Sequence, residues 1–152
     1  MRSQWSGCKA AKIADIPEAK FLNGLATLPT NPSVLLVGDS GAGLVYSLDS
    51  TSGEYSVAID DASLKPNASF PVTLGVNGIQ FRPGQDDYVY FTNSFKAPAF
   101  GRMPIDPPGG AQLGESEVHI VSTGKYGGGR DDFTFDSVGE SAYIANGALT
   151  AC

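Results

Sequence analysis

Residues 23–28 read Asn-Gly-Leu-Ala-Thr-Leu, and this pattern returns twice along the chain at a fixed distance. Residues 77–82 read Asn-Gly-Ile-Gln-Phe-Arg, and residues 131–136 read Asp-Asp-Phe-Thr-Phe-Asp. The step from Asn23 to Asn77 is 54 residues, and so is the step from Asn77 to Asp131. Each copy opens with a short oxygen-bearing side chain and continues with alternating apolar residues, as a β-strand does. Equal spacing indicates equivalent places in a repeated structural unit.

Further strand-like segments follow each copy in the same order. Second runs occupy residues 34–38, 88–92 and 142–145, third runs residues 44–49 and 101–106, and fourth runs residues 55–59 and 118–121. Turns rich in Gly, Pro, Asp and Ser separate these runs, and no window shows a sustained helical period. A row of four short strands in each repeat is the composition of a β-propeller blade. The sequence therefore predicts an all-β propeller with inner strands that begin near Gly24, Gly78 and Asp132.

The repeat length limits how many blades the chain can hold. We expect one partial propeller domain, residues 1–152, with about two and three-quarter blades of four-stranded antiparallel sheet. Residues 23–65 and 77–122 form blades, residues 131–147 form half a blade, and residues 9–14 form a lone outer strand of an absent blade. Propellers usually close with about four to eight blades. The chain is therefore interpreted as a fragment of a larger ring, a truncated gene model or one part of an oligomeric ring. Exposed blade edges predict self-association.

Charge and composition narrow the class of partner. The formal net charge is -6 and no basic cluster occurs, which argues against nucleic acid and anionic membranes as partners. No apolar stretch approaches the roughly 20 residues of a membrane helix, and the first residues lack the apolar core of a signal peptide. A small-molecule substrate is the remaining expectation, and the sequence does not fix a cellular location.

The opening residues of the three copies predict a cation site. If the units radiate from a common centre, the side chains of Asn23, Asn77 and Asp131 converge, and amide and carboxylate oxygens are the ligands of hard divalent cations. One alternative is that Asn-Gly between apolar runs marks a hairpin turn. A single copy favours that turn, but Asp-Asp is a poor turn of this type, so the trio in register favours a shared site. The recurring strand-end residues Asp39, Asn93 and Asn146 are interpreted as caps and turn formers.

The order of Asn-Gly, Asn-Gly and Asp at successive inner strands resembles the SMP-30/gluconolactonase/LRE family of six-bladed propellers. The resemblance covers about residues 9–147, and residues 21–29, Phe-Leu-Asn-Gly-Leu-Ala-Thr-Leu-Pro, look like the fungal branch. It implies one divalent cation, calcium, at the top of the central channel, with Asn23, Asn77 and Asp131 as ligands. It also implies that Asp131 is the general base or nucleophile, and the register favours Asp131 over Asp132. The family's first-blade Glu has no counterpart in this chain.

This resemblance leads to three hypotheses for function, and whether the chain is an enzyme stays open. The first is metal-dependent hydrolysis of a lactone or related ester, in which the cation polarises the carbonyl and a carboxylate activates water or attacks directly. The second is a secondary-metabolite pathway protein whose channel shapes an intermediate for cyclisation, as in hetero-Diels–Alder chemistry. Aromatic residues near the repeat are compatible with it: Phe81, Phe91, Phe95 and Phe100. The third is a non-enzymatic truncated remnant.

Overall fold

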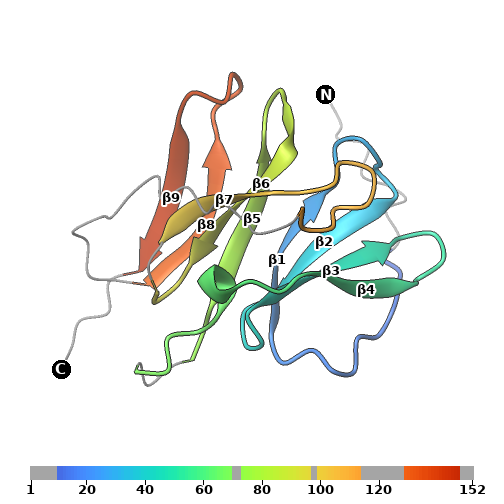
Figure 1. Ribbon diagram of the computed structural model, residues 1–152, viewed down its shortest axis with the longest axis horizontal. Helices are drawn as coiled ribbons and strands as arrows, with labels where there is room; N and C mark the ends of the chain where they lie inside the picture. The colour runs from blue at the N-terminus through green and yellow to red at the C-terminus, as the bar shows by residue number, and fades with distance from the viewer. Residues whose placement is uncertain (1–9, 70–72, 97–98, 114–128, 148–152) are drawn as a thin grey trace, which may run out of the picture.

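The computed structural model describes residues 10–69, 73–96, 99–113 and 129–147, which form three successive antiparallel β-sheets (Figure 1). Blade 1 holds the strands β1 (Leu22–Thr27), β2 (Val34–Asp39), β3 (Leu44–Asp49) and β4 (Tyr55–Ile59). Blade 2 holds β5 (Val76–Arg82), β6 (Gln85–Asn93) and β7 (Phe100–Pro104), and blade 3 holds β8 (Gly129–Phe135) and β9 (Ala142–Gly147). The only helix in the described part of the chain is the 3-10 turn η1 (Ala62–Leu64). No described helix has the length and apolar character to cross a membrane.

In every sheet the spatial order of the strands is their order along the chain. Neighbouring strands pair antiparallel, and the inner strands β1, β5 and β8 of consecutive sheets lie side by side (Figure 1). Such meanders, stacked face to face around an axis, are the blades of a β-propeller. The fold is therefore all-β and a partial propeller, as the sequence predicts. The fourth strand expected for blade 2, residues 118–121, lies outside the described residues.

Two expectations about strand boundaries differ from the structure. The inner strands begin at Leu22, Val76 and Gly129, two to three residues before the predicted starts. They do so because each pairs with its neighbour on both sides of a β-bulge at the repeated motif. Residues 10–14 carry no strand, although residues 9–14 were expected to form a lone outer strand. This segment instead lies across blade 1, with the carbonyl of Ile13 close to Gly53 in the β3–β4 turn.

The apolar core lies between the blades, so the middle strands are buried on both faces. The largest cluster joins blades 1 and 2 and includes Leu36, Val45, Ile79, Phe91 and Met103, each at most 1% exposed. The outer face of blade 1 carries a second cluster around Tyr46, against which Ala14, Ile16 and Ala19 of the N-terminal segment pack. A third cluster of aromatic residues joins blades 2 and 3. Burial of each large apolar side chain contributes about 1.5–3 kcal/mol, so packing between blades is the main source of stability.

A turn that follows β7 ties blade 2 back onto blade 1. Residues 105–113 run beside blade 1, as the amber loop near β2 in Figure 1 shows, and are closed by a bridge between Ile105 and Gln112. The N–H of Gln112 donates to the carbonyl of Ala58 at 3.0 Å, and the hydroxyl of Ser47 donates to the carbonyl of Gly109 at 3.1 Å. These bonds fix the spacing of blades 1 and 2, and with it the spacing of their inner strands.

Candidate functional site

The repeated motif forms the same β-bulge in all three inner strands. In β1, three steps from Leu22 to Leu25 face two steps on β2, so Asn23 and Gly24 lie opposite one residue. The equivalent irregularity lies between Val76 and Ile79 in β5 and between Arg130 and Phe133 in β8. A bulge of this kind bends its strand and re-aims a side chain, and bulges are common beside active sites. The three predicted site residues, Asn23, Asn77 and Asp131, each take the first place in the bulge.

The Asn-Gly pairs are not hairpin turns. Both pairs lie inside strands, β1 and β5, and neither Gly24 nor Gly78 has the positive φ that a type I′ turn requires. The glycines are needed for close packing instead. A Cβ built on Gly24 would lie 2.1 Å from the carbonyl oxygen of Asn77, and one built on Gly78 would lie 2.6 Å from Oδ1 of Asp132. Each glycine therefore lets the next inner strand approach at the level of the motif.

Two buried hydroxyl groups connect the motif of β5 to its surroundings. Thr92 accepts from the N–H of Gly78 at 2.8 Å and donates to the carbonyl of Asp131 at 2.7 Å, so one hydroxyl bridges blades 2 and 3. The Nδ2 of Asn77 donates to Oγ of Ser94 at 3.0 Å. Because that bond holds the nitrogen end of the amide, it orients Oδ1 of Asn77 as the end available to a ligand.

The exposure of Asn23, Asn77 and Asp131 depends on whether a described blade lies on both sides of the residue. Asn77 has a blade on either side and only 6% of its surface exposed, whereas Asn23 and Asp131 are exposed on the first and last described inner strands. The structure brings the backbones of the three motifs together through the contact of Gly24 with Asn77 and through Thr92. Convergence of their side-chain oxygens on one ion stays a prediction.

Asp132 takes a different place from its neighbour Asp131. Its Oδ1 accepts from the N–H of Phe133 at 2.8 Å and lies against Gly78 of blade 2. The carboxylate of Asp132 is thus part of the contact between blades 2 and 3. This makes Asp132 a matched control for Asp131, since the two carboxylates are adjacent in sequence and both residues are exposed.

Asp39, at the end of β2, caps the loop that enters β1. Its carboxylate accepts from the backbone N–H groups of Lys20, Phe21, Gly41 and Ala42 at 2.8–3.0 Å, and the residue is fully buried. Burial works against the charged form, but the four N–H donors outweigh it and hold the pKa of Asp39 below its ordinary value of 3.8. The interpretation of Asp39 as a cap is confirmed.

Asn93, the equivalent residue of blade 2, is a cap as well. Its Nδ2 donates to the carbonyls of Ser63 at 2.8 Å and Lys65 at 3.1 Å, and its Oδ1 accepts from the N–H groups of Phe95 and Lys96. It therefore fastens the connection between blades 1 and 2 to the end of β6. Asn146, the third member of this series, is exposed, and its role as a cap stays a prediction.

A chain of backbone hydrogen bonds runs from blade to blade just outside the bulges. Ser40 donates to Phe21 at 2.8 Å, Gly75 to Ser40 at 2.8 Å, Ser94 to Gly75 at 3.0 Å, and Arg130 to Ser94 at 3.2 Å. Sequence reasoning missed the role of the two serines, although they are 54 residues apart and follow the caps directly. This chain of bonds fixes the height at which the three bulges stand relative to one another.

The donor set of the bulges fits a hard divalent cation in type. Oxygens of two amides and one carboxylate are the ligands that calcium takes, and Asn77 is already oriented by Ser94. Among the described residues, no three His, Cys, Asp or Glu side chains gather closely enough to hold a metal. A cation here would therefore depend on the amides of Asn23 and Asn77, and three protein oxygens would leave much of its shell to water.

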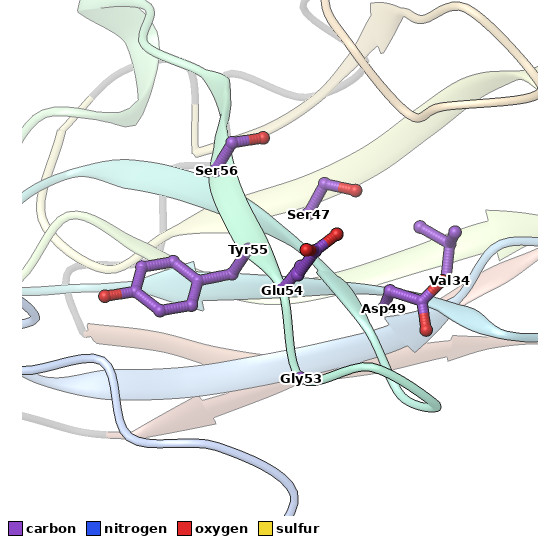
Figure 2. Close-up of a pocket in the computed structure, with 7 residues that line it drawn as sticks. All are labelled: Val34, Ser47, Asp49, Gly53, Glu54, Tyr55 and Ser56. Carbon is purple, nitrogen blue, oxygen red and sulfur yellow. The ribbon is translucent and has the colours of Figure 1, made fainter.

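A hollow with a volume of about 530 Å³ lies beside the β3–β4 hairpin, and Figure 2 shows the residues that line it. Ser47, Asp49 and Glu54 lie on one side of it, but Oδ1 of Asp49 already accepts from Thr51, and Ser47 is bonded to Gly109. The ring of Tyr55 extends away from this group (Figure 2), and its hydroxyl donates to Glu18. Because Ser47 and Oδ1 of Asp49 are already hydrogen-bonded within the protein, the bulges remain the better candidate site.

One curated protein is similar to most of this chain. No family model matches the chain. A protein of Phoma sp. described as "Putative hetero-Diels-Alderase" is 26% identical over 153 residues, which cover 91% of this chain and 42% of that protein. The chain thus spans well under half the length of the curated relative that it matches.

Two solved structures are similar to part of this chain. Regucalcin from Agrobacterium tumefaciens strain C58, a calcium-binding protein, superposes with a TM-score of 0.52 at 25% identity, over 82% of this chain and 37% of that one. Aldose sugar dehydrogenase from Streptomyces coelicolor, in its PQQ-bound form, gives a TM-score of 0.46 at 24% identity, over 64% of this chain and 29% of that one. The second match is too partial to bear on function. The likeness to regucalcin supports the propeller fold, and membership of the SMP-30/gluconolactonase/LRE family stays a prediction.

Proposed function

We propose that this chain carries part of the active site of a cation-dependent hydrolase that acts on a lactone or related ester. The observation that supports this most is the repetition of one bulge in three neighbouring inner strands. Each bulge presents an oxygen-bearing side chain, Asn23, Asn77 or Asp131, at an equivalent place. Packing explains the two glycines of the motif, Gly24 and Gly78, but it does not explain why an Asn or Asp opens all three copies.

Each of the three residues has a distinct part in this proposal. Asn23 and Asn77 hold the cation through neutral amide oxygens, and Asp131 adds the negative charge that a calcium site needs. When bound, the cation supplies Lewis-acid polarisation of the substrate carbonyl. The carboxylate of Asp131 takes the proton from the attacking water, and Ser94 keeps the amide of Asn77 in one orientation.

Similarity to regucalcin supports the choice of calcium, because that protein is described as calcium-binding. The chain spans 37% of that structure and 42% of the curated relative, so a complete shell needs oxygens beyond the three named here. With three protein oxygens we expect weak binding, with a dissociation constant of about 10⁻⁴–10⁻³ M.

The test is calcium titration of residues 1–152 by calorimetry, together with turnover of a simple lactone. Asp131→Asn should weaken calcium binding at least tenfold, whereas Asp132→Asn should leave the affinity within about twofold. Ser94→Ala should weaken it by about tenfold, since residues that orient metal ligands typically contribute 10–100-fold. Equal affinity in the Asp131 and Asp132 variants would show that the carboxylate ligand has been misassigned, and absence of calcium binding would remove the cation from the proposal.

A second candidate function is cyclisation of a reactive intermediate in the channel. The observation in its favour is the match over 91% of the chain to the Phoma protein. Such a site needs apolar walls that fold the substrate, and a cation is not essential to it. The two functions are separated by adding a chelator during assays. Hydrolysis of a lactone that stops with the chelator supports the hydrolase, whereas cyclisation of a diene–carbonyl substrate that continues supports the second candidate.

A further inference from the structure

A cavity of about 300 Å³ lies between blades 2 and 3, at the opposite end of the strands from the bulges. It is formed where the β5–β6 and β8–β9 hairpins lie side by side at the upper edge of Figure 1. Arg82, at the cavity, lies five residue steps along β5 from Asn77, or about 16 Å at 3.3 Å per step. The cavity is therefore a separate place from the candidate cation site, and its volume lies at the lower end of the range for ligand pockets.

Aromatic rings form the floor of this cavity. Tyr90 packs edge-to-face on Phe135, with ring centroids 5.0 Å apart at 81°, and stacks with Phe100 at 6.1 Å and 30°. Tyr90 and Phe100 of blade 2 are 5% and 4% exposed, and Phe135 of blade 3 packs on Tyr90, so both blades contribute to the floor. Edge-to-face pairs of this kind hold rings in fixed orientations, which suits the recognition of a flat, apolar ligand.

Arg102 is held in place above this floor. Its guanidinium carbon lies 4.4 Å from the centroid of Tyr88, a cation–π contact, and its NH1 is 3.5 Å from the hydroxyl of Tyr90. That hydroxyl in turn donates to Oε1 of Gln85 at 2.7 Å. An arginine fixed in this way presents its remaining N–H groups as a fork, which matches a carboxylate with two parallel hydrogen bonds.

The charges around the cavity leave a net positive balance. Arg82 and Arg102 both line it, and Glu140 is the one carboxylate among the lining residues. The ion pairs found among the described residues, Lys12–Asp15 and Lys65–Asp60, involve neither arginine. Arg82 lies against the Gly139 turn, where both its Cγ and its Nε are close to the position of a Cβ on Gly139. The two guanidinium groups thus favour an anion in a chain whose overall charge is negative.

We propose that this cavity binds a small aromatic carboxylate, independently of the chemistry at the bulges. The carboxylate pairs with the fork of Arg102 and with Arg82, and the ring lies against the floor of Tyr90, Phe100 and Phe135. The volume of about 300 Å³ accommodates one ring with one or two substituents. Glu140 opposes the bound anion at the rim and limits its affinity.

Benzoate is the probe, and residues 1–152 labelled with ¹⁵N are the protein. We expect saturable shifts of the arginine Nε–H signals of Arg82 and Arg102, with a dissociation constant on the order of 1 mM. Benzyl alcohol at the same concentration should bind at least tenfold more weakly. Arg102→Met should weaken benzoate binding at least tenfold, and Arg102→Lys should do so about threefold to tenfold, because lysine keeps the charge and loses the fork. Lys12→Gln, which removes one charge far from the cavity, is the control and should leave the affinity unchanged.

A second variant should change the benzoate affinity in the opposite direction. Glu140→Gln should strengthen benzoate binding about twofold to fivefold, and circular dichroism of each variant should match that of the unchanged chain. Inorganic phosphate that binds as tightly as benzoate would overturn the aromatic part of the proposal. Unchanged benzoate affinity in folded Arg102→Met, or the absence of any shift at 20-fold above the expected constant, would overturn it entirely.

Discussion

Gly24→Ala should destabilise the chain more than any other exchange of glycine for alanine in blade 1 that keeps a negative φ. The new Cβ would lie 2.1 Å from the carbonyl oxygen of Asn77 and 2.9 Å from the nitrogen of Ile79. Both atoms belong to the backbone of β5, so neither can rotate away as a flexible side chain would. To reach an ordinary contact distance of about 3.5 Å, blades 1 and 2 must separate by more than about 1 Å.

The size of the effect follows from two opposing contributions. Overpacking of a tight interior costs about 1–3 kcal/mol and sometimes more, and a rigid backbone neighbour gives a cost near the upper end. Loss of glycine's freedom in the unfolded chain returns about 0.4–1 kcal/mol. The net loss in free energy of unfolding is about 2–3 kcal/mol. For a chain of this length that corresponds to a melting temperature lower by about 5–10 °C.

The matched control is Gly38→Ala, on the strand that pairs with β1. The nearest atoms to a Cβ at Gly38 are 3.5–3.8 Å away, which is ordinary contact, and the residue does not have a positive φ. We expect its melting temperature to stay within about 2 °C of the unchanged chain, because little repacking is needed. The measurement is thermal unfolding by circular dichroism at 218 nm. Equal melting temperatures for the two variants would refute the close approach of β1 to β5, and with it the geometry on which the candidate site depends.

Three further perturbations test other contacts. Asp39→Asn should lower the free energy of unfolding by about 1.5–3 kcal/mol at pH 7, because it removes charge-assisted hydrogen bonds. The pKa of Asp39 is depressed in the folded protein, so this stability is present above pH 3.8 and is lost as the pH falls through the folded pKa. The urea midpoints of variant and parent should therefore approach each other in acid. Thr92→Val should lower the free energy of unfolding by about 1–3 kcal/mol, because the N–H of Gly78 and the carbonyl of Asp131 lose the hydroxyl that bridges them. Thr92→Ser keeps that hydroxyl and should lose less than half as much in the same urea titration. Self-association through exposed edges stays a prediction, and Leu25→Asp, on a residue 53% exposed, should lower the mass measured by light scattering.

Local signals made the strands predictable. The alternation after Asn23, Asn77 and Asp131, and the polar residues that close the second runs, depend only on neighbours along the chain. The third and fourth runs of blade 1 coincide with β3 and β4, since their turns carry Gly at positions with positive φ, Gly43 and Gly53. The cap role of Asp39 was predictable for the same reason, because a short polar side chain at a strand end finds backbone N–H groups within a few residues.

Features that depend on strand register or on contacts between blades were not predictable. The bulges of β1 and β5 begin one residue after the strands do, and a bulge is a property of register between two strands that the sequence of one does not reveal. The cavity of Arg82 and Arg102 depends on how the β8–β9 hairpin lies against blade 2. Residues 10–14 have strand-like composition, yet a strand needs a paired edge, and the segment packs on the face of blade 1 instead.

The same bulges determine how closely the blades pack and where the candidate ligands lie, and this has a measurable consequence. The distortion that lets Gly24 touch β5 is also the one that re-aims Asn23, so Gly24→Ala should lower both the melting temperature and the calcium affinity. Asp131→Asn removes an exposed carboxylate without altering packing, so it should lower the affinity at least tenfold and move the melting temperature by less than about 2 °C. Measured on the same samples, the two variants separate the structural role of the motif from its role as a ligand. Loss of stability without loss of calcium affinity in Gly24→Ala would mean that the cation does not depend on the spacing of β1 and β5. In that case Asn23 is not a ligand, and the site would rest on Asn77 and Asp131 alone.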